Sequence, residues 1–235
     1  MQRLRIRYGK RGRLRFTSHR DFSRAFERAV ARARVPVAYS SGFSPHPRIS
    51  YAGAAPTGSA SEAEYLELAL AERVDPAELG RALDDALPDG LDVLDVVVAG
   101  PGSLPERLEA SLWRITVPGV PGPVAEDAVR RFMDSSSITV QRMTKKGLRE
   151  FDCRAAVVSL QTCPAPDSRQ PCAILEVVLR HGSPSVRPDD VLAGLREVAG
   201  LEADAAVLHQ RLAQGPLAPE GGTLGDPLAP DRDAV

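Results

Sequence analysis

The feature that most constrains the fold is the order in which the spacing of apolar residues changes along the chain. Residues 3–16 alternate in period two, which predicts an inward apolar face and an arginine face on a hairpin or a bent strand. Residues 18–33 then adopt helical spacing, with Ser18 as the N-cap. Two extended segments, a helix opened by Asp75 and a strand at 91–98 follow. This order is the ferredoxin-like split βαβ pattern.

A second run of similar elements is predicted further along the chain. We therefore expect an α+β protein of tandem ferredoxin-like modules, with antiparallel sheets and helices on one face. The final segment is rich in Pro, Gly and charged residues and has few large apolar ones, which is typical of disorder. The predicted organisation is an N-terminal module at residues 1–100, a linker at 101–111, a C-terminal module at 112–213 and a disordered tail at 214–235.

Composition excludes several classes of site and location. Cys153, Cys163 and Cys172 do not have the spacing of a zinc or iron–sulfur site, so we expect this chain to bind no metal and no cofactor of its own. No segment approaches the ~18 apolar residues of a membrane span. The first residues also lack the apolar region of a signal peptide. We expect a cytoplasmic protein without a membrane partner.

Charge is balanced overall but divided along the chain. The sequence has 30 basic and 31 acidic residues. Residues 1–50 hold thirteen Lys or Arg and two acids, whereas residues 51–110 hold three Arg and thirteen acids. One interpretation is internal pairing, in which acids at 62–67 lie on a strand that crosses the arginine face. The other is that the basic segment binds a polyanion.

The predicted first helix favours the polyanion. Four arginines repeat at every fourth residue and form a single stripe on its exposed face: Arg20, Arg24, Arg28 and Arg32. Like charges at this spacing cost roughly 0.2–0.5 kcal/mol per pair, and only Glu27 offers partial relief. Phosphates would offset that cost, because each neutralised charge releases a counterion. The predicted phosphate-binding residues of this module are Arg11, Arg20, Arg24, Arg28 and Arg48.

Two histidines form a second candidate site. His19 lies in the first turn of the helix beside Asp21, and His46 lies between two prolines in a loop. Such a pair can act as acid and base in RNA cleavage, or bind a metal together with Asp21. Because no third ligand or nucleophile accompanies them, we favour local roles for both histidines and assign no catalytic residue.

A basic turn in the second module is the third candidate. Residues 142–149 read RMTKKGLR between two predicted strands, and basic hairpin tips often bind the nucleic-acid backbone. We therefore add Lys145 and Lys146 to the predicted phosphate-binding set, on condition that they lie on the same side as the first patch.

Several of these segments resemble one bacterial family. The segments are FTSHRD at 16–21, RAFERA at 24–29, PVAYSSGFSPHPRIS at 36–50 and SEAEY at 61–65. Together they resemble the radical-SAM-linked protein family, a domain of unknown function that is fused to radical SAM proteins or encoded beside one. The resemblance implies a radical SAM partner that carries an iron–sulfur cluster and S-adenosylmethionine. It implies the stand-alone form here, because the chain lacks a Cys-x3-Cys-x2-Cys run.

Three functions follow as hypotheses. The first is a non-catalytic RNA-binding accessory protein that holds RNA, with transfer RNA as a candidate, for a radical SAM enzyme. In it, His19, Asp21 and His46 would line the groove that faces the substrate. The second is a metal-independent endoribonuclease that uses His19 and His46. The third is a protein–protein adaptor whose arginine surface contacts an acidic radical SAM partner.

Overall fold

The computed structural model describes residues 2–144, 147–164 and 170–232 and consists of two compact units. Unit 1 contains the chain up to Leu108 and again from Asp226 onward, and unit 2 contains Glu109–Gly225. Both units combine helices with antiparallel sheets, so the protein is of the α+β class.

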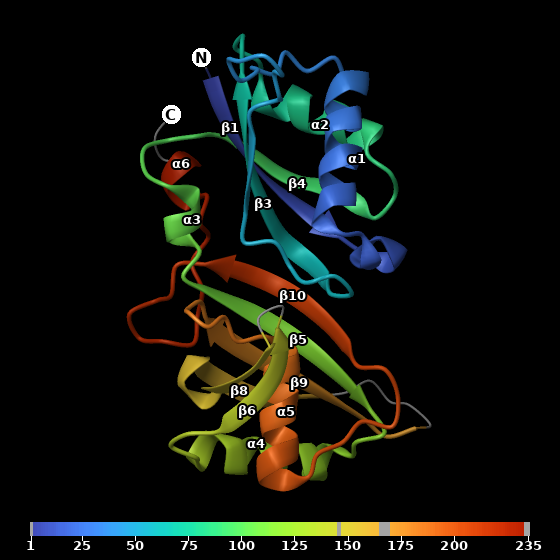
Figure 1. The fold of residues 1–235 in the computed structure, drawn as a ribbon, viewed down its shortest axis with the longest axis vertical. Helices are drawn as coiled ribbons and strands as arrows, with labels where there is room; N and C mark the ends of the chain where they lie inside the picture. The colour runs from blue at the N-terminus through green and yellow to red at the C-terminus, as the bar shows by residue number, and fades with distance from the viewer. Residues whose placement is uncertain (1, 145–146, 165–169, 233–235) are drawn as a thin grey trace. The chain divides into compact units, whose positions relative to one another are not determined.

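Unit 1 is a four-stranded antiparallel sheet with two long helices on one face (Figure 1). The strand order is β4-β1-β3-β2. Its elements are β1 (Gln2–Lys10), the 3-10 helix η1 (Gly12–Phe16), α1 (His19–Arg32), β2 (Ile49–Ala52), β3 (Ala60–Leu70), α2 (Pro76–Ala86), β4 (Leu91–Val98), α3 (Leu104–Arg107) and α6 (Ala229–Arg232).

The core of unit 1 follows from the two periodicities in the sequence. On α1 the buried residues are Phe22, Phe26, Ala29 and Val30, which lie on one side of the helix. They pack against alternate residues of the central strands, such as Ile6 of β1 and residues 66, 68 and 70 of β3. The predicted N-caps are confirmed, since the Ser18 side chain accepts from the backbone N–H of Asp21 and Asp75 caps α2 in the same way.

The prediction for residues 3–16, a hairpin or a bent strand, is wrong in both forms, because the strand ends at Lys10. β1 has β3 on one edge and β4 on the other, so no edge is left for a hairpin partner from the next segment. After Lys10 the chain forms the short helix η1. In it, the backbone N–H of Leu14 donates to the Arg11 carbonyl, and the N–H of Thr17 donates to the Leu14 carbonyl. The inward position predicted for Phe16 is also wrong, because this residue is 59% exposed.

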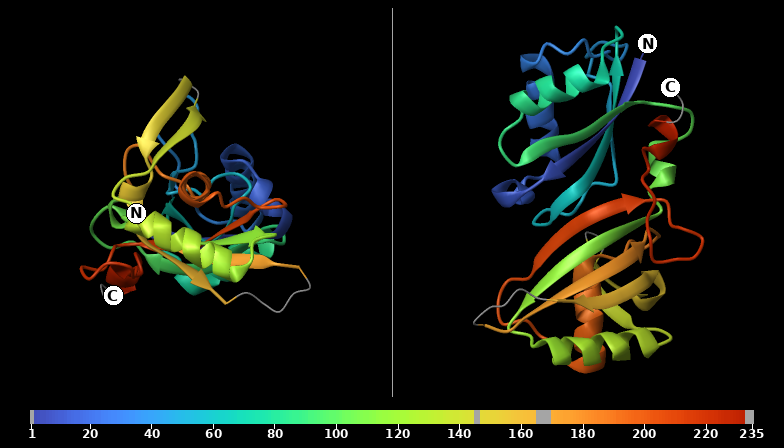
Figure 2. Two further views of the ribbon diagram at one scale, coloured as in Figure 1. Left: turned by 90° about the horizontal axis from the view of Figure 1, so that it is seen from below. Right: turned by 180° about the vertical axis from the view of Figure 1, so that it is seen from behind.

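Unit 2 has a comparable sheet with an added hairpin. The strand order is β10-β5-β9-β8, and β6 pairs only with β7 in a separate two-stranded sheet (Figure 2). Its elements are β5 (Ala110–Pro118), α4 (Gly122–Asp134), β6 (Thr139–Thr144), β7 (Gly147–Asp152), η2 (Arg154–Ala156), β8 (Val157–Cys163), β9 (Cys172–Arg180), α5 (Pro188–Ala199) and β10 (Leu208–Gly215). The short helix η2 thus separates β7 from β8.

The chain after residue 213 differs from the predicted disordered tail. β10 continues to Gly215, and the segment from Asp226 returns to unit 1. There Leu228 is fully buried in a small apolar cluster with Tyr65 and Leu104, on the other face of the β3 strand from the main core. Composition alone indicated disorder. A few buried contacts are enough to order so short a segment, and composition does not record them.

A buried ion pair fixes this returning segment. Arg5 and Asp231 have fully buried side chains, and Arg5 Nη1 lies 2.6 Å from Asp231 Oδ1. Arg107 Nη1 donates to Asp231 Oδ2 at 2.9 Å, and the backbone N–H of Gly100 donates to Oδ1 at 2.9 Å. Burial raises the pKa of the Asp231 carboxyl, but these hydrogen bonds outweigh burial and lower it below its usual value.

We predict that Asp231→Asn lowers the free energy of unfolding by about 3–5 kcal/mol, because it leaves the buried Arg5 guanidinium without its main counter-charge. Urea unfolding followed by circular dichroism measures this. Asp127→Asn on α4, which breaks exposed pairs with Arg130 and Arg131, is the control and should cost less than about 1 kcal/mol. Since the folded pKa of Asp231 is depressed, its contribution should be present near neutral pH and disappear as the pH falls through that value. Equal losses in the two variants would contradict the prediction.

A second prediction concerns helix packing in unit 2. A Cβ at Gly194 of α5 would lie 2.7 Å from Cε2 of Phe132 and 2.9 Å from Sγ of Cys153. Gly194→Ala should therefore destabilise unit 2 by about 1–3 kcal/mol through overpacking, although alanine is the better helix former. The fluorescence of the sole tryptophan, Trp113, reports unfolding of unit 2. Gly122→Ala, which would meet nothing within 4 Å, should not destabilise.

Candidate nucleic-acid interface

The exposed side of α1 carries a row of arginines that form no ion pair with any described residue. The apolar stripe of the helix faces the sheet, which turns the opposite side to solvent. That side holds four exposed arginines: Arg20, Arg24, Arg28 and Arg32. In the part of the chain that the structure describes, none of the four lies within 4 Å of a carboxylate oxygen, and Glu27 forms no ion pair with them. We call these four residues the α1 arginine row.

Three arginines of the strand and its following turn, Arg3, Arg5 and Arg11, differ from this row, because acidic residues of β3 and β4 pair with them. Arg3 Nη1 lies 3.0 Å from Glu67, and Arg5 Nε lies 3.2 Å from the same carboxylate. Arg11 donates to Glu62 and also lies 2.7 Å from Asp92. Internal pairing therefore accounts for these three arginines, but it does not extend to the α1 arginine row among the described residues.

Arg11 and Arg48 are both exposed, but Arg11 is already paired with two carboxylates and Arg48 lines a pocket together with Glu67. Hydrogen bonding to Glu62 raises the pKa of Arg11, and its two carboxylate partners leave it little net charge to offer a phosphate. Arg48 lies beside a pocket of about 290 Å³ that Arg3 and Glu67 also line. We therefore restrict the candidate surface to the α1 arginine row.

His19 and Asp21 occupy the start of α1 but form no catalytic pair. Asp21 accepts a hydrogen bond of 2.6 Å from the Ser18 hydroxyl, as part of the cap. The His19 ring meets the Tyr51 ring edge to face, with centroids 5.0 Å apart. Burial raises the pKa of Tyr51 to about 12, so this phenol stays protonated at neutral pH.

His46 belongs to a different part of unit 1. The segment at residues 40–47 follows the C-terminal end of α1, whereas His19 lies at its N-terminal end (Figure 1). The loop is closed by Ser40, whose N–H donates to the His46 carbonyl and whose hydroxyl accepts from the His46 N–H. The structure brings His19 together with Tyr51, not with His46.

The basic turn of the second module is only partly described. Lys145 and Lys146 lie outside the described residues. Arg142, at the start of this turn, contacts Asp190 at 2.5 Å and stacks on the Phe151 ring with its guanidinium carbon 4.9 Å from the centroid. Its charge is therefore already matched within unit 2.

The sequence reasoning missed exposed aromatic residues near α1. Phe16 is 59% exposed, Tyr39 is 58% exposed and Phe43 is completely exposed. The signal for Phe43 was its place in a loop of Gly, Ser and Pro, which cannot bury a ring by periodic packing. Nothing in the sequence indicated that Phe16 is exposed, because residues 3–16 alternate like one continuous strand with Phe16 on its inward face.

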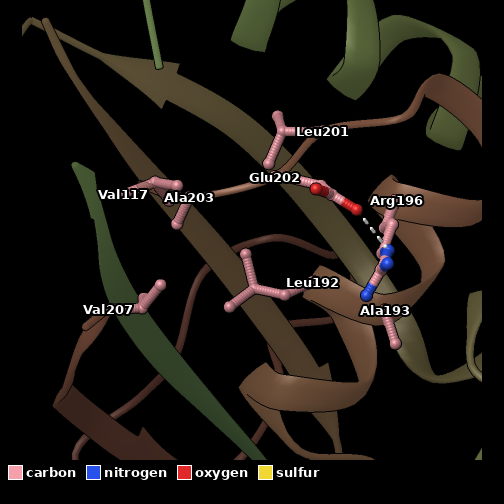
Figure 3. Close-up of a pocket in the computed structure, with 8 residues that line it drawn as sticks. All are labelled: Val117, Leu192, Ala193, Arg196, Leu201, Glu202, Ala203 and Val207. Carbon is pink, nitrogen blue, oxygen red and sulfur yellow. Dashed lines mark ion pairs between the residues drawn. The ribbon is translucent and has the colours of Figure 1, made fainter. Parts of the chain in front are cut away.

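Other features of the described residues include a pocket in unit 2. A pocket of about 350 Å³ in unit 2 is lined mainly by apolar residues, and its two charged residues, Arg196 and Glu202, neutralise each other at 2.7 Å (Figure 3). Among the described residues, no group of three or more His, Cys, Asp or Glu is placed to bind a metal. Within the same residues, no helix combines the length and the apolar character needed to cross a membrane.

Comparison with known proteins assigns a family. The chain belongs to DUF2344, uncharacterized proteins conserved in bacteria, whose profile matches residues 3–188. No curated protein matches it significantly. It is similar to a chain in a Cbf5-Nop10-Gar1 complex, at 9% identity and a TM-score of 0.49, over 90% of this chain and 48% of that one. This chain thus spans about half the length of that protein. An unknown protein from Galdieria sulphuraria matches at 13% identity and a TM-score of 0.26, over 89% of this chain and 98% of the other.

The α1 arginine row should cost stability in the isolated protein. Replacing Arg24 and Arg28 by Gln removes all three like-charge contacts at four-residue spacing, and glutamine has a similar helix propensity. We predict that Arg24→Gln/Arg28→Gln raises the free energy of unfolding by roughly 0.5–1.5 kcal/mol at low salt, less at high salt. Urea unfolding in both buffers measures it. A variant less stable than the wild type would mean that the row is paired within the protein.

Proposed function

We propose that this protein is a non-catalytic RNA-binding accessory protein that binds the phosphate backbone through the α1 arginine row. The observation that carries the proposal is the contrast between two sets of arginines in one unit. Arg3, Arg5 and Arg11 have carboxylate partners, whereas no carboxylate lies within 4 Å of the α1 arginine row among the described residues. A row of uncompensated charge fits a polyanionic ligand.

The geometry of α1 suits a backbone ligand. Consecutive arginines of the row are four residues apart, so they rise by ~6 Å along the helix axis. The row therefore extends over ~18 Å, which is a line of charge rather than a pocket for one small anion. Arginine also offers several N–H donors in a planar fork that matches phosphate oxygens. Such contacts fix position and orientation but carry no sequence information.

We further propose that the RNA is held for a radical SAM enzyme, which would supply the iron–sulfur cluster and S-adenosylmethionine. The motifs at 16–21 and 36–50 support this through their resemblance to the radical-SAM-linked family. A purely structural adaptor is the competing case. Co-purification of the two proteins that survives nuclease and high salt would favour the adaptor, whereas loss of the complex on nuclease treatment would favour RNA as the link.

The arrangement of both sheets supports a proposal of tandem ferredoxin-like modules. In unit 1 the order β4-β1-β3-β2 accompanies strand, helix, two strands, helix, strand along the chain. In unit 2 the order β10-β5-β9-β8 is equivalent when the β6–β7 hairpin is treated as an insertion between α4 and β8.

The test is binding of bulk transfer RNA by the wild type and by Arg20→Ala/Arg24→Ala/Arg28→Ala over a salt series. Each lost phosphate contact should reduce the slope of log affinity against log salt by about 0.7–0.9, so the triple variant should lose roughly 2–3 units of slope. Fluorescence anisotropy measures both affinity and slope. The binding reaction should leave the RNA uncut in EDTA, because the proposed role is holding the RNA.

Arg130→Ala/Arg131→Ala is the matched control. These arginines are also exposed on a helix, but both contact Asp127. The control should keep the wild-type slope. Equal affinity and slope for the wild type and the triple variant would remove the proposed function. Discrete RNA cuts that disappear in His46→Ala would favour the endoribonuclease instead.

A further inference from the structure

Two exposed phenylalanines flank α1, at opposite ends of the helix. Phe16 ends η1, two residues before the N-cap Ser18. Phe43 lies in the segment at residues 40–47, which follows the C-terminal end of the helix (Figure 1). Single exposed apolar residues are common on proteins, but one exposed aromatic ring in the segment before an arginine-bearing helix and another in the segment after it are a more specific pattern.

Phe16 is presented as an open ring with one side already stacked. The guanidinium carbon of Arg15 lies 4.5 Å from the ring centroid, in the position of a cation–π contact. The loop beside the ring is tied to the same segment, because the N–H of Gly58 donates to the Arg15 carbonyl. Gly58 has no side chain to cover the ring, and a Cβ there would lie 4.0 Å from Cε1 of Phe16. The ring is therefore 59% exposed but held in place.

Phe43 is presented by a closed loop. Tyr39 and Pro47 form an isolated bridge at its base, and Ser40 bonds to both the carbonyl and the N–H of His46. Gly42, which precedes the ring, has φ of +137°, a conformation that other residues rarely adopt. The Phe43 side chain is completely exposed at the tip. The loop therefore orders its own base and leaves the ring free for a ligand.

We propose that Phe16 and Phe43 are stacking platforms for unpaired bases, so that the ligand of the α1 surface is single-stranded RNA. This inference rests on the proposed RNA-binding function and narrows its substrate class. Bases inside a duplex are stacked on one another and offer no free face to a protein ring, whereas unpaired bases do. Sequence-independent single-strand binders combine a basic track with such rings.

The charge beside Phe16 favours RNA over a protein partner. Arg15 stacks on Phe16, and Arg20 of the α1 arginine row begins only four residues further along the chain. A base that stacks on the open face of Phe16 would have its phosphates near these guanidinium groups. A protein partner that covered Phe16 with an apolar surface would also have to place carboxylates beside Arg15 and Arg20 to neutralise them. Binding of a protein partner to these rings is one of the outcomes that the experiment below distinguishes.

The experiment compares the wild type, Phe16→Leu and Phe43→Leu in binding a labelled short oligouridylate and an RNA duplex of equal length. Leucine keeps an apolar side chain but removes the flat ring. Each variant should bind the single strand roughly fivefold or more weakly. Duplex affinity and the salt slope for either ligand should stay unchanged, because no phosphate contact is lost. A fluorescent base analogue in the oligomer should be quenched by the wild type and less by the variants.

Val124→Ala on α4, another exposed apolar residue, is the control and should bind like the wild type. Circular dichroism confirms that each variant is folded. Single-strand binding by both Phe variants at wild-type affinity would overturn the stacking proposal while leaving RNA binding intact. Absence of any RNA binding by the wild type would instead overturn the proposed function, and the stacking proposal with it. Unchanged RNA binding with loss of a co-purifying protein would assign the rings to a protein partner.

Discussion

The burial of the apolar stripe of α1 determines where the charge of this protein is available. Because Phe22, Phe26 and Val30 must face the sheet of unit 1, the residues at the opposite positions of the helix must face solvent. Those positions hold arginine at every fourth residue. The same contact that stabilises the unit therefore holds a line of positive charge in a fixed place, and rotation of the helix to bury the charge would expose three large apolar side chains.

Several acidic residues of unit 1 pair with arginines outside the α1 arginine row. Glu62 and Glu67 lie on β3, which pairs with β1, and they neutralise arginines of the strand and of the turn after it. Asp231 comes from the far end of the chain and neutralises the most deeply buried guanidinium, Arg5. The near-zero net charge of the chain thus combines local pairing in some places with, among the described residues, an arginine row that has no carboxylate partner. A global charge count cannot distinguish these cases.

The elements that the sequence predicted well are those set by neighbouring residues. The caps at Ser18 and Asp75 depend on residues three positions away, and both form as expected. The predictions that failed depended on partners distant in sequence. β1 lacks a hairpin partner because strands from later in the chain occupy both edges, and this exposes Phe16. The order of the final segment depends on Arg5 and Asp231, which are separated by 226 positions. Similarly, the sequence shows the spacing of the arginine row, but only the structure shows that no carboxylate of the described ranges pairs with it.

The most direct test of this account observes the arginine side chains themselves. Nuclear magnetic resonance of the Nε–H groups, during titration with a short single-stranded RNA, follows each guanidinium separately. The account predicts that the signals of Arg20, Arg24 and Arg28 shift together with increasing RNA, whereas those of Arg130 and Arg131, which already pair with Asp127, remain in place. Shifts confined to other arginines, or no shifts at saturating RNA, would contradict the claim that the exposed face of α1 is the surface that binds the phosphate backbone.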